Sequence, residues 1–125
     1  MKKIILTSIL LFQLGNLFSQ EFMINVTAES RNDYKINGND SEGSINGFDP
    51  DLKFKAGSKL FFKIKAQGHP FLIKLKPGTG KKNLVENISN NGIAKGTIEW
   101  VPTDKGIYYY QCIKHKNMVG RITIF

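Results

Sequence analysis

Three residues near the carboxyl end of the chain carry side chains that bind soft metal ions. Cys112, His115 and Met118 lie within seven residues, in the spacing C-x2-H-x2-M. A thiolate, an imidazole and a thioether at the end of one strand and in the following loop can converge on one soft ion. Three ligands on a single tight loop cannot enclose a metal, so a fourth ligand must come from a neighbouring strand.

His69 is the remaining imidazole, because the chain has two His and one Cys. It follows Gln67-Gly68 and begins a strand-like run, which places it at a junction between a loop and a strand. Two imidazoles and a thiolate in a plane, with a more distant thioether, form the coordination of a blue-copper electron-transfer site. The pattern therefore predicts one copper ion bound by His69, Cys112, His115 and Met118.

Each of these residues has a simpler interpretation when it is taken alone. A buried Cys or Met is most often a core residue, and a single His is most often a surface or hydrogen-bonded residue. The combination favours copper, because the loop contains the only Cys of the chain and the remaining His lies at a compatible strand edge. One Cys also excludes an intramolecular disulfide and a zinc site built on several thiolates.

The elements that must position these ligands are strands. Apolar and polar residues alternate along 60–66 and 71–76, and a period of two is typical of a half-buried strand. The other predicted strands are 22–26, 34–37, 51–55, 97–101, 107–112 and 120–125. About seven or eight short strands at this spacing predict an all-β fold, an antiparallel Greek-key β-sandwich. We expect 81–88 to form a turn or two of helix and 38–47 to be a surface loop.

The first nineteen residues differ in composition from the rest. Met1-Lys2-Lys3 is basic, 4–18 is mostly apolar, and Ser19-Gln20 is small and polar, which is the order of a secretory signal peptide. The alternative is a membrane anchor, but about fifteen residues is shorter than the roughly 20 needed to span a bilayer. We expect residues 1–19 to be a signal peptide and 20–125 to be one exported domain, periplasmic or secreted, without a membrane span.

Two segments of the chain resemble the cupredoxin family of blue copper proteins. The stretch 108–120, YYYQCIKHKNMVG, has the short ligand-loop spacing of the amicyanin members, and the otherwise similar plastocyanins have two more residues between His and Met. The second segment, Gly68-His69-Pro70-Phe71, lies about forty residues upstream, where the family has its first His. The resemblance spans roughly residues 33–125. It implies a cupredoxin-like β-sandwich of eight strands that binds one type 1 copper ion cycling between Cu(I) and Cu(II).

The resemblance also implies a role for each ligand. His69 and His115 would be equatorial imidazoles, Cys112 the equatorial thiolate and Met118 the weak axial ligand. Gly68 matches a position whose carbonyl faces the metal in azurin. The His on the ligand loop reaches the surface in this family and serves as the electron exit, which implies that role for His115.

Two positions depart from the family pattern. Pro70 follows the first His, where many members have an Asn that ties this strand to the ligand loop. Lys114 and Lys116 flank the second His, where amicyanin members have Pro. Contacts of this kind orient the ligands and tune the metal, but neither change removes a ligand.

The ligand set predicts a small protein that shuttles single electrons between redox partners and is not an enzyme. Thiolate and thioether suit Cu(I), imidazole suits both oxidation states, and the chain has no second cluster of His. Two alternatives remain open. One is a copper carrier or buffer that delivers metal without electron transfer, and the other is a metal-free β-sandwich interaction module.

The charge balance bears on the partners. The net charge is +8 at pH 7, and the segment 53–82 contains Lys but no acidic residue. Strand alternation predicts outward positions for Lys63, Lys65, Lys74 and Lys76, which form either a solvated sheet face or a surface that steers the protein toward an acidic redox partner. Nucleic acid is not an expected partner, since the lysines lack clustered Arg or a recognition motif. We expect a monomer.

Overall fold

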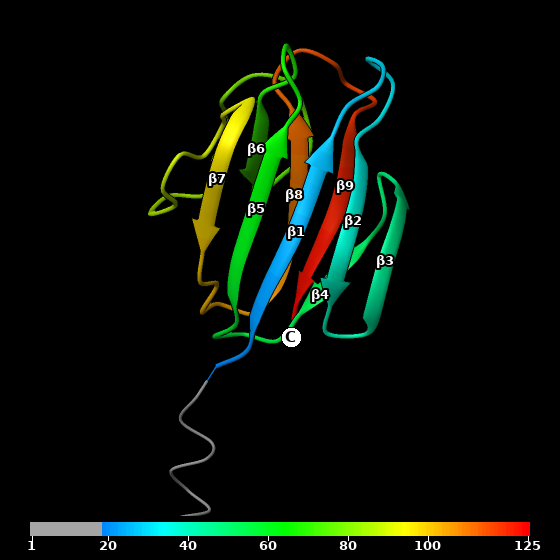
Figure 1. Cartoon of the computed structure of the whole chain (residues 1–125). Helices are drawn as coiled ribbons and strands as arrows, with labels where there is room; N and C mark the ends of the chain where they lie inside the picture. Colours follow the sequence, from blue (N-terminus) through cyan, green and yellow to red (C-terminus); the bar gives the residue numbers. More distant parts are fainter. Residues whose placement is uncertain (1–18) are drawn as a thin grey trace, which may run out of the picture.

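Two β-sheets pack face to face in this computed structural model, which describes residues 19–125 (Figure 1). The strands are β1 (Glu21–Thr27), β2 (Lys35–Asp40), β3 (Gly43–Phe48), β4 (Leu52–Phe54), β5 (Lys59–Lys65), β6 (Phe71–Lys74), β7 (Lys95–Trp100), β8 (Gly106–Cys112) and β9 (Val119–Ile124). Apart from Ser19, the predicted signal peptide lies outside the described residues. Within the described part of the chain, no helix is long and apolar enough to cross a membrane.

The strand order is β3-β2-β1-β5-β7 in one sheet and β4-β9-β8-β6 in the other. The predicted all-β sandwich is therefore confirmed, with nine strands in residues 19–125 rather than seven or eight. The prediction of a wholly antiparallel arrangement is wrong, because β1 pairs in parallel with β5, and β4 with β9. In each parallel pair both strands belong to one sheet, and the chain passes through the other sheet between them.

The additional strand comes from the segment 38–47, which was predicted to be a loop and is a β-hairpin instead. β2 and β3 pair antiparallel across a tight turn at Ser41-Glu42. The hairpin lies at the edge of its sheet, so most of its side chains reach solvent and the apolar alternation that marks a strand is weak. Ile36 and Ile45 are its buried members.

The predicted helical turns at 81–88 are also wrong. This segment forms turns with isolated bridges, such as the one between Lys74 and Leu84. Asn83 and Asn87 have φ angles of 60° and 62°. A left-handed residue cannot continue a right-handed helix, so these two positions interrupt it.

The core lies between the two sheets and comes from the alternate, inward-facing residues of their strands. In β1 the buried positions are Phe22, Ile24 and Val26, as the period of two predicts. The last inward-facing residue of β8 is Cys112, which is fully buried. The core therefore extends up to the first residue of the metal-binding loop.

Lys74 is buried, although its strand position predicted that it would lie on the solvated surface. Its exposure is 1%, because the turn at 77–80 folds over the outer face of β6. The Lys74 ammonium donates hydrogen bonds to the carbonyl oxygens of Gly78 and Gly80, and burial lowers its pKa. Lys63, Lys65 and Lys76 are exposed, as predicted.

Gly120 is required for the packing of β8 against β9. It pairs with Tyr110, and a Cβ atom at this position would overlap the Tyr110 ring. The ring has little freedom to move, because it is fully buried and its hydroxyl donates to the Pro50 carbonyl at 2.6 Å. We expect Gly120→Ala to lower the free energy of unfolding by about 1–3 kcal/mol, the usual cost of overpacking, measured by urea unfolding of the metal-free protein.

Gly47 provides the control for this experiment. A Cβ atom there would meet no atom within 4 Å, so Gly47→Ala should change the free energy of unfolding by no more than about 0.5 kcal/mol. Equal effects of the two substitutions would contradict the packing argument.

Candidate metal centre

The pairing of β6 with β8 brings the distant His next to the metal-binding loop. Phe71 lies opposite Cys112 in an antiparallel register, so the residues before Phe71 lie opposite those after Cys112. The Ile113 amide donates to the Pro70 carbonyl at 3.2 Å and extends this pairing beyond the strands. His69 therefore lies beside the loop that carries His115.

The nitrogen and sulfur atoms of three predicted ligands converge. The Nδ1 atoms of His69 and His115 are 3.3 Å apart, and the Cys112 Sγ atom lies 3.9 and 3.6 Å from them, respectively. A metal about 2.0 Å from each nitrogen and about 2.3 Å from the sulfur, in one plane, would separate nitrogen from sulfur by about 3.7 Å and the nitrogens by about 3.5 Å. The three atoms therefore already have the spacing of a trigonal metal site.

The main chain of Met118 is hydrogen-bonded to that of two other predicted ligands. Its amide donates to the His115 carbonyl at 3.2 Å, and its carbonyl accepts from the Cys112 amide at 2.9 Å. Its side chain is fully buried. Thiolate, thioether and two imidazoles form the donor set of type 1 copper, and the residues present fit that ion.

His69 is prepared for metal binding by its surroundings. Burial lowers its pKa, and the neighbouring His115 and Lys114 lower it further. The lowered pKa favours the neutral imidazole, whose lone pair is available to a metal.

Solved structures with this architecture are known, whereas no protein-family model and no curated protein sequence matches the chain. Rusticyanin from Thiobacillus ferrooxidans aligns with a TM-score of 0.57 at 20% identity, over 86% of this chain and 79% of that one. Another structure, described as the copper protein rusticyanin, gives 0.58 at 18% identity, over 86% and 80%. A purple cupredoxin from Nitrosopumilus maritimus gives 0.50 at 15% identity, over 82% and 98%.

The chain has the cupredoxin fold. At these identities the likeness establishes the architecture alone, and the chemistry of the site follows from the residues at the end of the sandwich. In this cupredoxin fold the four predicted ligands lie at the end where β8 stops and β6 begins, at the top of Figure 1.

Gln111 is a residue of the site that the sequence analysis missed. It is fully buried beside Cys112, and its Nε2 atom donates to the carbonyl oxygens of Cys112 and His115 at 3.1 and 2.9 Å. Its Oε1 atom accepts from the Gly78 amide at 3.0 Å. Gln111 therefore joins the ligand loop of this cupredoxin fold to the turn that covers Lys74. Gln111 occupies an outward position on its strand, so the alternation of apolar and polar residues predicts a solvated side chain and did not indicate that Gln111 belongs to the site.

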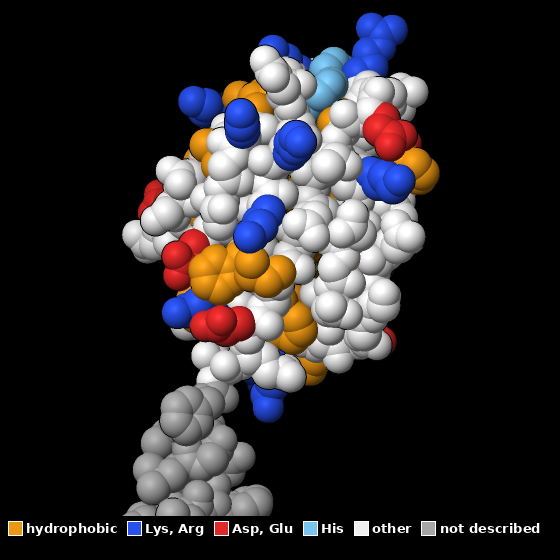
Figure 2. Space-filling view, viewed as in Figure 1, with side chains coloured by type: hydrophobic (Ala, Val, Ile, Leu, Met, Phe, Trp, Pro, Cys, Tyr) orange, Lys and Arg blue, Asp and Glu red, His pale blue; other side chains and the backbone are white. Residues whose placement is uncertain are grey.

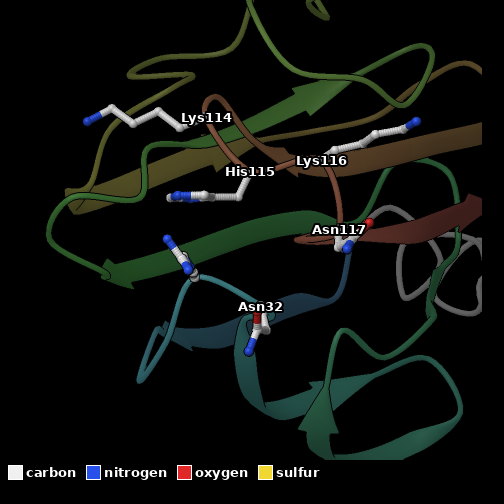
Figure 3. Close-up of a pocket in the computed structure, with 6 residues that line it drawn as sticks. Asn32, Lys114, His115, Lys116 and Asn117 are labelled. Atoms are coloured by element: carbon white, nitrogen blue, oxygen red, sulfur yellow. The ribbon is translucent and has the colours of Figure 1, made fainter.

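His115 lies at the edge of a basic surface depression. The depression has a volume of about 300 Å³ and is lined by Arg31, Asn32, Lys114, His115, Lys116 and Asn117 (Figure 3). Lys114 and Lys116 extend to opposite sides of the His115 ring in this view. Arg31 comes from the loop between β1 and β2 and was not singled out by the sequence analysis. Because Arg31 is far from the ligand loop in sequence, no local sequence pattern connected it to the site.

Replacing Gln111 by Leu tests the link between the loop and the turn. The substitution leaves the Gly78 amide without its partner, and a buried unsatisfied group costs about 1–3 kcal/mol. We expect that loss in free energy of unfolding and a copper affinity about 10–100-fold lower, the usual effect of removing a contact that orients ligands. Urea unfolding and competition with a copper chelator measure the two quantities. The exposed Gln67 gives the control, and a Gln67→Leu variant with equal losses would contradict the assignment.

Proposed function

We propose that this protein binds one type 1 copper ion and carries single electrons between redox partners, without catalysing a reaction of its own. The observation that supports this most directly is the convergence of His69, Cys112 and His115, whose ligand atoms all lie within 4.8 Å of one another. In the proposal, the imidazoles of His69 and His115, the thiolate of Cys112 and the thioether of Met118 would hold the copper ion, and the thioether would be its weakest ligand.

The preformed ligand arrangement supports electron transfer. Copper at this site supplies exchange of one electron between Cu(I) and Cu(II). The chain keeps the ligands in place through backbone hydrogen bonds at Cys112, Met118 and Ile113, and through the buried amide of Gln111. Ligands held in this way move little when the charge of the site changes. A small rearrangement gives fast one-electron exchange.

His115 is the proposed electron exit. Cys112 and Met118 are fully buried, whereas the His115 ring is partly exposed and lines the surface depression. A partner that covers the depression would therefore contact an imidazole bound directly to the metal.

The proposed partner has an acidic docking surface. Arg31, Lys114 and Lys116 are exposed around His115, and Figure 2 shows Lys and Arg side chains gathered near the pale blue His at the top of the molecule. None of these three cations is in an ion pair within residues 19–125, where the pairs are Lys35–Glu29, Lys53–Glu42 and Arg121–Asp51. Unpaired cations around the exit attract carboxylates and speed encounter with an acidic surface.

The proposal includes export of a monomer to the periplasm or the cell exterior after cleavage of residues 1–19. The composition of this segment supports export. A metal-bound Cys112 is also protected in an oxidising compartment, where a free exposed thiol would form intermolecular disulfides.

The colour of the protein with Cu(II) tests the metal site. The mature protein should bind one equivalent and absorb visible light strongly, because thiolate-to-copper charge transfer gives such sites their blue colour. Cys112→Ser should abolish the band with the fold retained. Met118→Leu should retain copper and raise the reduction potential, since loss of a weak axial donor destabilises Cu(II) more than Cu(I). Visible absorption and voltammetry measure these effects, and a blue Cys112→Ser variant would disprove the ligand assignment.

The rate of electron self-exchange separates a carrier of electrons from a carrier of copper. A blue protein that exchanges electrons slowly and gives up copper readily to a chelator would be a metal carrier or buffer instead.

Reversing the charges around His115 tests the docking surface. We expect Lys114→Glu/Lys116→Glu to slow electron transfer to an acidic redox protein at low salt and to weaken its salt dependence, because salt screens charges over about 8–10 Å. Arg31→Glu should act in the same direction, although Arg31 is far from the ligand loop in sequence. The measurement is the stopped-flow rate at several ionic strengths.

Exposed lysines elsewhere provide the control for the docking test. Lys55→Glu/Lys105→Glu makes the same change in net charge at the opposite end of the sandwich, where β4 ends and β8 begins. If both double variants lower the rate equally, the effect comes from net charge and the exit surface is not a docking site.

A further inference from the structure

Tyr34 occupies an unusual position under the metal site. Its side chain is fully buried, and its hydroxyl lies 2.9 Å from the His69 carbonyl and 3.1 Å from the Pro70 carbonyl. Tyr34 immediately precedes β2, in the other sheet, 35 residues from His69 in sequence. It therefore joins the two sheets at the segment that carries a predicted ligand.

The backbone of the segment 69–70 needs an external donor at this point. The His69 amide donates to the Ala66 carbonyl at 2.9 Å, while Pro70 has no amide hydrogen and no polar side chain. The carbonyls of His69 and Pro70 therefore need donors from other segments. The Ile113 amide donates to the Pro70 carbonyl at 3.2 Å. The Tyr34 hydroxyl donates to the His69 carbonyl.

Tyr34 is itself held firmly. Its amide donates to the Asp49 Oδ1 atom and its carbonyl accepts from the Asp49 amide, both at 2.9 Å. Its ring packs edge-on against Phe71, with centroids 5.2 Å apart. Phe71 is the residue that pairs with Cys112. Asp49 thus holds the main chain of Tyr34, and Phe71 packs against its ring, so the direction of the hydroxyl is fixed.

We propose that Tyr34 is a positioning residue of the metal site, which holds the main chain of His69 at the ligand loop through its hydroxyl. The part of this inference that concerns metal binding rests on the proposed copper function. The part that concerns the backbone does not, because the contacts described here join protein atoms only.

Tyr34→Phe removes the hydroxyl and keeps the ring contacts, so the fold should be retained. In the metal-free protein we expect the Ile113 amide to exchange with solvent about three- to tenfold faster, the factor that corresponds to one lost buried hydrogen bond. In the copper-loaded protein we expect the affinity for Cu(II) to fall about 10–100-fold and the visible band to shift. Hydrogen exchange by NMR, chelator competition and absorption measure the three effects.

Tyr108→Phe is the matched control. It removes one tyrosine hydroxyl that donates to a carbonyl, that of Asp104 at 2.7 Å, before the start of β8 and away from the predicted ligands. If Tyr34→Phe affects Ile113 exchange and copper affinity no more than this control, the proposal is wrong. Faster exchange with an unchanged copper affinity would also overturn it, because Tyr34 would then support the backbone alone.

The two proposals can fail separately. If the wild-type protein binds no copper, the proposed function fails. The exchange of the Ile113 amide in the metal-free protein still decides whether Tyr34 holds the segment 69–70.

Discussion

The antiparallel pairing of Phe71 with Cys112 is the constraint on which the metal centre depends. This register places the chain before β6 alongside the chain after β8, and it brings His69 within 3.3 Å of His115, 46 residues away. A shift of one residue would turn Cys112 out of the core and move the His rings apart, because side chains alternate between the faces of a strand. Burial of Phe71 and Cys112 between the sheets disfavours such a shift.

The polar groups near the site add rigidity to this pairing. Gln111 on the outer face and Tyr34 on the inner face both bond to main-chain atoms next to predicted ligands. Both are fully buried, and no buried side-chain nitrogen or oxygen in the described part of the chain lacks a partner. A fully satisfied polar network of this kind favours one arrangement of the loops. That rigidity suits the proposed function, in which the same ligands would serve two oxidation states.

The site also combines a dry interior with a charged rim. Cys112 and Met118 belong to the hydrophobic core, whereas His115 lies among exposed cations at the end of the sandwich. The lysines on β5 lie along a strand and do not line the depression. They follow from strand alternation, and their exposure has an ordinary explanation as a solvated sheet face.

Much of this protein was predictable from local sequence patterns. The period of two located most strands within one or two residues of their observed bounds, and the spacing of Cys112, His115 and Met118 indicated a soft metal site. Local patterns failed where a turn outside the strand covers a strand residue. Lys74 and Gln111 occupy outward strand positions, but the turn at 77–80 covers them.

The sequence by itself determined the all-β class, the residues available as ligands and the basic flanks of His115, because these depend on residue type and short spacing. Only the tertiary structure decided that β2 and β3 form a hairpin, that Arg31 joins the lysines, and that Tyr34 bonds to the carbonyl of His69. The physical reason is that hydrogen-bond partners and burial are set by strand pairing and by the packing of two sheets. In the case of Arg31 and Tyr34, they bring together residues that are 35 or more positions apart.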